Sequence, residues 1–396
     1  AQEGPPRPVQ RRRRTLTSMT DCDVVVIGCG GAGSAAAAEL ARRGHHVIGV
    51  EQFAALHDRG SSHGSERIVR TAYTDPMYAK LAAESIESWK SLERSTGEQL
   101  LTMCGGIDFG FPDELRAIEA SCASAGMPTE WIEPLEATRR FPGFRFEDPV
   151  LFQPESGTVH ADRAVAMFHR LAIAAGAELR FDTPVIRIMN DGNEAVVVTA
   201  SGTIRTRTVV FAGGAWADRL LDGLLDGFDA GRTRRELLPE LTVTNEQVFF
   251  FRPVSDFAWP TFIRRRIPEY YGLPTPDGLL KAGGHYTGAP IDPDRRGEPD
   301  PQARRAVSEW MRENVPGVDP DPVRSTTCLY ATYPDEDFII DRVGNVVMAT
   351  GLGGHGFKFL PEIGRRVADL VDGVETADNP FAFDRVARSV GPSGHK

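Results

Sequence analysis

Long apolar runs, closely spaced cysteine pairs and an excess of basic charge are all missing from this chain of 396 residues. A helix that crosses a bilayer needs about 20 consecutive apolar residues, so their absence argues against a membrane protein. The formal net charge of -10 argues against nucleic acid as a main partner. The cysteines contain no C-x-x-C pair, which argues against a disulfide framework or a zinc site and favours a reducing cytoplasm. They are Cys22, Cys29, Cys104, Cys122 and Cys328.

The first twenty residues also lack the long apolar stretch that an export signal requires. This segment contains several prolines and the run Arg11–Arg14, but a twin-arginine signal would continue into an apolar segment. The next apolar run, Val24–Ile27, is far too short and belongs to a predicted strand. We therefore expect residues 1–20 to be a disordered leader, with Met19 as an alternative initiator.

The first ordered unit is predicted to be a strand, a helix and a second strand. Hydrophobic residues make up 41% of the chain, and its length exceeds one typical core, so we expect two domains. Apart from Asp23 and His46 at their starts, residues 23–27 and 46–50 are apolar, as in strands buried on both faces of a parallel sheet. The alanine-rich stretch 34–43 between them predicts a helix that packs close to that sheet.

Two later segments repeat the order of strand, glycine turn and helix. Residues 209–216 lead into a predicted helix at 217–225, and residues 345–354 lead into one near 362–371. Residues 244–251 and 270–281 are rich in aromatic and β-branched residues, which is typical of antiparallel strands. A helix is predicted at 301–314, and an amphipathic stretch covers 113–125.

These patterns predict an α/β protein with two interleaved domains. One is a Rossmann-type nucleotide-binding domain, and the other is a substrate domain on a mixed, mainly antiparallel sheet. The expected boundaries are 21–104, 156–234 and 332–390 for the nucleotide-binding domain, and 105–155 and 235–331 for the substrate domain.

A glycine motif predicts dinucleotide binding. Gly28, Gly30 and Gly33 form a G-x-G-x-x-G turn between the first strand and helix, and Glu51 ends the second strand. The first glycine permits a tight turn, the second lets the backbone approach a pyrophosphate, and the third allows close helix–strand packing. The helix N-terminus offers free N–H groups to phosphates, and Glu51 can accept hydrogen bonds from a ribose. The motif does not distinguish FAD from NAD.

A series of later motifs carries a family resemblance. They are G-S-S-H-G-S-E-R-I-V-R-T-A-Y at 60–73, Y-Y-G at 270–272, Lys281 with His285, C-x-Y at 328–330, P-D-E-D-F-I-I-D at 334–341 and G-G-H-G-F-K at 353–358. In this order they resemble the monomeric sarcosine oxidase and N-methyltryptophan oxidase family of covalent flavoproteins. The resemblance extends over about residues 21–385.

The resemblance implies FAD as the cofactor, bonded to the protein through the sulfur of Cys328. Taken alone, a single cysteine of this kind would be a buried core residue. Besides the glycine motif and Glu51, the residues implied to lie at the cofactor are His63, Arg67, Gly353, Gly354 and Gly356.

The resemblance also implies how substrate and oxygen are handled. Arg70 and Lys358 are implied to bind the substrate carboxylate, which a planar guanidinium recognises through paired hydrogen bonds. Lys281 is implied to promote the reaction of reduced flavin with oxygen, because a fixed cation stabilises the developing negative charge. Taken alone, each of these cations would be a solvated surface residue. Arg67 and Arg70 lie three positions apart, so on a turn or helix they would share a face. Arg67, Tyr271 and His285 are further candidate catalytic residues, and Tyr330 is a candidate substrate-binding residue.

The chain also departs from the family pattern. Ser62, Thr71 and Leu273 replace side chains that are common there, and the run Arg264–Arg266 is the most unusual feature. In a strand, Arg265 points opposite to its two neighbours. The run is either a solvated basic edge or a sign that the substrate carries an extra anionic or larger polar group.

We therefore expect an FAD-dependent oxidase of an N-substituted amino acid that yields an imine, or an aldehyde and amine, with hydrogen peroxide from oxygen. Because the amine must be neutral to react, activity is expected to rise toward alkaline pH. The alternatives are an oxidase of a cyclic imino acid such as pipecolate, a dehydrogenase that passes electrons to a partner protein, and a non-enzymatic nucleotide-binding protein. We expect a monomer without a metal.

Overall fold

A computed structural model describes residues 21–191, 193–221, 238–254, 256–295, 297–374, 378–383 and 385. The expected leader at 1–20 and residues 222–225 of the helix predicted at 217–225 lie outside the described residues. Within the described part of the chain, no helix has both the length and the apolar character needed to cross a membrane.

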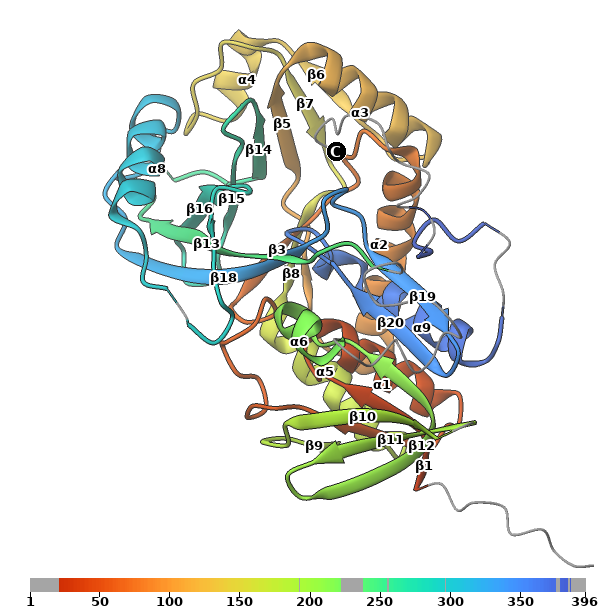
Figure 1. Cartoon of the computed structure of the whole chain (residues 1–396). Helices are drawn as coiled ribbons and strands as arrows, with labels where there is room; N and C mark the ends of the chain where they lie inside the picture. The colour runs from red at the N-terminus through yellow and green to blue at the C-terminus, as the bar shows by residue number, and fades with distance from the viewer. Residues whose placement is uncertain are drawn as a thin grey trace, which may run out of the picture.

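A largely parallel sheet contains the strand–helix–strand unit predicted from the start of the sequence (Figure 1). β1 (Cys22–Ile27) lies between β2 (Val47–Val50) and β12 (Gly202–Phe211) and runs parallel to both. Val24 and Val26 pack into one hydrophobic cluster, whereas Val25 and Ile27 pack into another. Both faces of β1 are therefore buried, as its apolar sequence predicts. The other strands are β9 (Glu178–Arg180), β10 (Val185–Asp191), β11 (Glu194–Thr199), β19 (Ile339–Val343) and β20 (Val346–Thr350).

Three helices from distant parts of the chain pack together against this sheet. α1 (Gly31–Arg42) contacts both α5 (Ala161–Ala174) and α9 (Leu360–Val371), and the three share one hydrophobic cluster with β1. Small residues allow this close approach: a Cβ added at Gly364 of α9 would lie 2.8 Å from the carbonyl oxygen of Ala35 in α1. Glycine is therefore needed where α9 meets α1.

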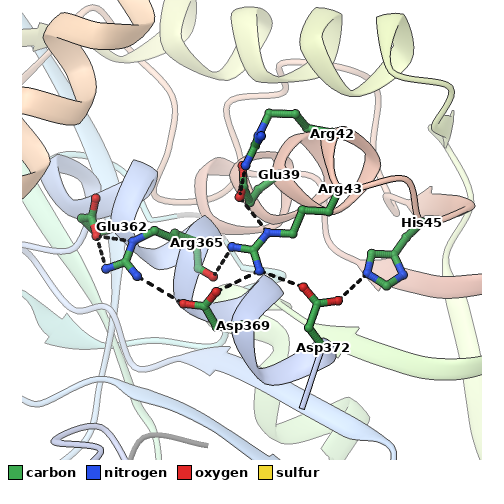
Figure 2. Close-up of polar contacts among 8 residues, drawn as sticks. All are labelled: Glu39, Arg42, Arg43, His45, Glu362, Arg365, Asp369 and Asp372. Carbon is green, nitrogen blue, oxygen red and sulfur yellow. Dashed lines mark hydrogen bonds and ion pairs between the residues drawn. The ribbon is translucent and has the colours of Figure 1, made fainter. Parts of the chain in front are cut away.

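An ion-pair network at the surface also joins α1 to α9 (Figure 2). Arg43, directly after α1, pairs with Glu39 of the same helix and with Asp369 and Asp372 of the α9 region, each at 2.8 Å. His45 reaches Asp372 at 2.7 Å. The Arg43 side chain is only 20% exposed, so solvent screens these pairs less than fully exposed ones.

A second sheet combines segments at 106–153 and 242–332. Its strands pair antiparallel, except that β14 (Thr261–Arg265) runs parallel to β5 (Gly106–Gly110). The stretch predicted as strand at 270–281 is a hairpin of β15 (Tyr270–Pro274) and β16 (Leu280–Gly284), with Gly278 in the turn at a φ of 77°. The other strands are β6 (Glu130–Ile132), β7 (Val150–Gln153), β13 (Thr242–Phe251), β17 (Ala289–Pro290) and β18 (Arg324–Thr332).

A third, small sheet was not anticipated from the sequence and lies between the two larger ones (Figure 1). It consists of β3 (Glu66–Val69), β4 (Leu101–Thr102) and β8 (Gly157–His160). Arg67 lies on β3 and Arg70 directly follows it, so the two arginines belong to a strand and its end and not to a turn or helix.

The remaining elements agree with the mixed α/β class, which is confirmed. α8 (Pro301–Asn314) has the predicted bounds, and α3 (Pro112–Ser124) covers the predicted amphipathic stretch. The division into two domains at the expected boundaries stays a prediction. The other helices are α2 (Pro76–Thr96), α4 (Pro134–Arg140), α6 (Ala217–Leu221), and the short 3₁₀ turns η1 (Gly214–Trp216) and η3 (Phe357–Phe359).

Candidate active site

The glycine turn between β1 and α1 borders a cavity of about 290 Å³. Gly28 has a φ of 89°, and a Cβ there would lie 2.5 Å from the carbonyl oxygen of Ala212. A Cβ at Gly33 would lie 1.7 Å from the carbonyl oxygen of Gly28, so Gly33 serves close packing and does not line the cavity. At Gly30 the nearest atom to an added Cβ is Ser62 Oγ at 3.4 Å, which leaves the backbone open to a ligand.

Glu51 lines the same cavity directly after β2 and lies next to the glycine turn. It accepts hydrogen bonds from the backbone N–H groups of Cys29 at 2.8 Å and Phe53 at 3.1 Å. Burial alone would raise the pKa of Glu51, but His57 and these N–H groups outweigh burial and lower it. The carboxylate is therefore ionised, as a ribose-binding acceptor requires. His63 lines the same cavity.

A second cavity, of about 150 Å³, adjoins the first. Because the two share part of their walls, one elongated ligand fits both, as a dinucleotide with a flavin ring would. The shared residues are Ala32, Ser61, Ser62, Leu352 and Gly353. The predicted site residues that line the second cavity are Arg67, Arg70, Tyr271, Lys281, His285, Cys328, Tyr330, Gly353, Gly354, Gly356 and Lys358.

Two buried cations, Arg70 and Lys358, meet at Tyr73 beside the second cavity. The Arg70 guanidinium lies 4.7 Å from the centre of the Tyr73 ring, and Lys358 Nζ donates a hydrogen bond to the Tyr73 hydroxyl at 2.7 Å. Among the described residues, Nη1 of Arg70 has no hydrogen-bond partner. Burial, together with Arg70 and Arg265, lowers the pKa of Lys358 well below its usual value. A bound carboxylate would give Nη1 of Arg70 a hydrogen-bond partner and would stabilise the charged form of Lys358.

Tyr73 and His355 were not predicted as site residues. The Tyr73 hydroxyl lies 3.2 Å from Nδ1 of His355, and Nε2 of His355 lies 3.3 Å from the carbonyl oxygen of Glu336. This arrangement fits a neutral histidine that donates from Nε2 and accepts at Nδ1, and burial lowers its pKa well below 6.5. Tyr73 lies in the motif at 60–73 and His355 in the motif at 353–358. These motifs could therefore have identified both as site residues.

Lys281 is a third buried cation in the second cavity. Its Nζ donates to the backbone carbonyl of Glu66 at 3.2 Å. Burial and the neighbouring Arg67 lower the pKa of Lys281 to about 7. The Glu66 side chain is also buried, and burial raises its pKa. The alternative interpretation of Lys281 as a solvated surface residue is therefore wrong.

Arg67 holds the loop that separates the two cavities. Its Nη2 donates to the carbonyl oxygens of Ser61 and His63, each at 2.7 Å, and its Nη1 donates to that of Glu66 at 2.9 Å. These three hydrogen bonds to backbone carbonyls fix the Arg67 guanidinium beside Lys281. No carboxylate takes part in them, so the positive charge of Arg67 can act on a ligand in the cavity.

The aromatic wall of the second cavity remains uncharged at neutral pH. Burial lowers the pKa of His285 to about 4 and raises the pKa values of Tyr271 and Tyr330 above their usual value. The half-buried Cys328 lies on β18 two residues before Tyr330.

The structure corrects both interpretations of the run Arg264–Arg266 at its central residue, Arg265, whereas Arg264 and Arg266 are partly exposed. Arg265 points opposite to Arg264, as predicted, but it is only 3% exposed and does not line the cavity. Its Nε bonds Asp108 at 2.8 Å, and its Nη1 bonds Glu269 at 3.1 Å. Arg265 is therefore neither a solvated edge nor a contact for an anionic substrate group.

Comparisons with known proteins agree with this site. A family described as "FAD dependent oxidoreductase" matches residues 23–370. The chain is 34% identical to a monomeric sarcosine oxidase of Streptomyces avermitilis, over 91% of this chain and 96% of that protein. It is 31% identical to an N-methyl-L-tryptophan oxidase of Yersinia pestis, over 88% and 94% respectively. A solved structure of NikD, described as an unusual amino acid oxidase essential for nikkomycin biosynthesis, is 29% identical with a TM-score of 0.80 and covers 91% of this chain and 97% of that one.

A nucleotide cavity at a glycine turn that opens into a cavity lined by cations and aromatic residues defines a flavin-dependent oxidoreductase. The chain belongs to the FAD dependent oxidoreductase family, and FAD is its cofactor. The predicted resemblance to sarcosine and N-methyltryptophan oxidases is confirmed. The alternative of a non-enzymatic nucleotide-binding protein is wrong.

Proposed function

We propose that this enzyme oxidises the CH–NH group of an amino acid with a secondary amine and uses oxygen as the electron acceptor. The observation that carries the proposal is the unbonded Nη1 of buried Arg70 beside Lys358, which together suit a carboxylate. Relatives named for oxidation of sarcosine and N-methyl-L-tryptophan, both N-methyl amino acids, support it.

When bound, FAD would supply the acceptor for the hydride, one proton with two electrons, that leaves the substrate carbon, and the second proton comes from the substrate nitrogen. Arg70 and Lys358 hold the carboxylate and thereby fix the neighbouring carbon and nitrogen. The substrate loses two electrons and two protons to become an imine, and oxygen gains both to become hydrogen peroxide. Water then hydrolyses an open-chain imine, whereas a cyclic imine leaves intact.

Lys281 provides the positive charge for the oxygen reaction. Its ammonium is fixed by the Glu66 carbonyl and faces the same cavity as Arg67. A cation held in a dry cavity stabilises the charge that develops when oxygen takes up its first electron. The neutral His285 and the protonated tyrosines add no competing charge.

A peroxide-coupled screen tests the reaction. The panel contains N-methyl amino acids, cyclic imino acids such as pipecolate, and the corresponding amines without a carboxylate. We expect peroxide from at least one carboxylate-bearing secondary amine and none from its decarboxylated counterpart. Turnover with an artificial acceptor but without peroxide would identify the dehydrogenase alternative instead.

We further propose that Cys328 holds the FAD covalently through its sulfur. The support is its place on the wall of the second cavity, which Lys281 and Tyr330 also line. Acid precipitation of the wild type should leave the yellow colour in the pellet, whereas Cys328→Ser should release it. Cys104→Ser is a matched control because Cys104 is also half-buried and lines neither cavity. Release of the flavin from the wild type would exclude the linkage.

A further inference from the structure

The second cavity has a carboxylate among its cations. Glu269, directly before β15, lines the cavity together with Arg70 and His285. Its carboxylate accepts a hydrogen bond from Arg265 at 3.1 Å. Its backbone carbonyl accepts one from the backbone N–H of His285 at 2.9 Å. The Glu269 side chain nevertheless stays 23% exposed. The carboxylate is thus fixed in place and still presents surface to the cavity.

Glu269 is not the only carboxyl group close to Arg265. The buried Asp108 already pairs with Arg265 at 2.8 Å, and Glu114 lies 3.6 Å from the same guanidinium. Arg265 therefore has carboxyl partners other than Glu269. Burial alone would raise the pKa of Glu269, but Arg265, His285 and Arg70 outweigh burial and lower it. Glu269 is ionised at neutral pH.

The surroundings of Glu269 show what kind of group it faces. Ile263 of β14 and Leu273 of β15 line the same cavity and give it an apolar side. Arg70, with its unbonded Nη1, provides the cation for the substrate carboxylate. A substrate side chain with an aliphatic stem and a positively charged end matches the apolar side and Glu269 together.

We propose that Glu269 is an anionic subsite for the substrate side chain, so that the preferred substrate is a secondary-amine amino acid whose side chain ends in an ammonium or guanidinium group. This inference rests on the proposed function. It reverses the expectation, drawn from the run Arg264–Arg266, that the substrate carries an extra anionic group. Arg265 is the positioning residue that holds Glu269.

The test compares three N-methyl amino acids that differ at the end of the side chain. N-methyl-L-ornithine and N-methyl-L-norleucine have side chains of equal length that end in an ammonium and a methyl group, and N-methyl-L-glutamate ends in a carboxylate. For the wild type we expect kcat/KM for the ornithine derivative to exceed that for the norleucine derivative about tenfold or more. The glutamate derivative should be the poorest substrate.

Variants assign that preference to Glu269. Glu269→Gln keeps an acceptor for Arg265 but removes the charge, and should reduce the ornithine-to-norleucine ratio to within about twofold. Glu269→Asp should keep a ratio in favour of ornithine. Glu313→Gln removes a charge of the same size from the exposed side of α8 and should leave the ratio unchanged.

Binding of non-oxidisable carboxylates separates recognition from chemistry. Perturbation of the flavin absorbance should show tighter binding of 5-aminopentanoate than of hexanoate to the wild type, and equal binding to Glu269→Gln. A wild type without preference for the cationic members, or a Glu269→Gln variant that weakens all three substrates equally, would overturn the inference. If no secondary-amine amino acid reduced the flavin at all, the proposed function itself would fail.

Discussion

Arg70 is the residue on which recognition of a carboxylate depends most. Its Nη1 is buried and lacks a partner within the described residues, and Arg70 lines a cavity that Lys358 also lines. We expect Arg70→Gln to lower kcat/KM for a secondary-amine amino acid about 100-fold, mainly through KM, because a charge-assisted pair of hydrogen bonds is lost. Steady-state kinetics measure this. A loss confined to kcat, with KM unchanged, would show that Arg70 does not contact the carboxylate.

Lys281 makes the two half-reactions respond oppositely to pH. Because burial lowers its pKa to about 7, Lys281 is cationic below that value and neutral above it. We therefore expect the oxygen reaction to slow as pH rises through this range, while amine oxidation accelerates because the neutral amine becomes more abundant. Stopped-flow measurement of each half-reaction across pH tests this.

Lys281→Met should slow only the oxygen half-reaction, by about 100- to 1,000-fold, and remove its dependence on pH. Anaerobic reduction by substrate should change little. Equal pH profiles in variant and wild type would show that another group controls the oxygen reaction.

The sequence predicts single residues well where a motif specifies them. One cavity is lined by residues from four separate segments of the sequence: Arg67 and Arg70, Lys281, Cys328, and Lys358. The sequence does not show the surroundings of Arg265, because its partner Asp108 is brought beside it only by the parallel pairing of β14 with β5. The alternation of side chains along a strand predicts the direction in which Arg265 points, but it does not predict which residues lie on that side.

At the scale of elements, two glycines of the β1–α1 turn have different functions that substitution separates. Gly33→Ala places a Cβ 1.7 Å from a backbone oxygen, so we expect severe loss of stability. Gly30→Ala meets nothing closer than 3.4 Å, so the protein should fold but bind FAD weakly, because the Cβ occupies the approach of the pyrophosphate. Thermal melting and the absorbance of bound flavin measure the two effects. Normal flavin content in Gly30→Ala would contradict this account of the turn.

The ion-pair network between α1 and α9 (Figure 2) predicts a stability difference between neighbouring arginines. Arg43→Ala removes pairs to Glu39, Asp369 and Asp372, and should lower the free energy of unfolding by about 1–2 kcal/mol. Arg42 is 70% exposed and pairs with Glu39, so Arg42→Ala should cost less than about 0.5 kcal/mol. Denaturant unfolding at low and high salt measures both. Equal effects of the two substitutions would show that the network adds nothing beyond single pairs.

Elements with strong local patterns were predicted closely, whereas those that depend on distant partners were not. The helix α8 has a proline at its first position and an aspartate cap at Asp300, both of which the sequence displays. The small sheet of β3, β4 and β8 has strands of at most four residues that pair only through the fold. Such short strands give no periodic pattern of their own.

At the scale of the whole molecule, the active site depends on segments from both ends of the described chain. The glycine turn comes from the first strand, while Lys358 and the glycines at 353–356 come from the segment before α9. The recurrence of strand, glycine and helix at 345–371 predicts that this late segment lies next to the glycine turn of the first strand and helix. The order of strands within each sheet could not be predicted, because it depends on long-range pairing.

The most direct test of the whole account is anaerobic mixing of the purified, flavin-containing enzyme with N-methyl amino acids. The account predicts that the yellow flavin absorbance bleaches with a carboxylate-bearing secondary amine, and that air restores the colour with one peroxide formed per flavin. Flavin that stays oxidised with every open-chain and cyclic secondary-amine amino acid would contradict it.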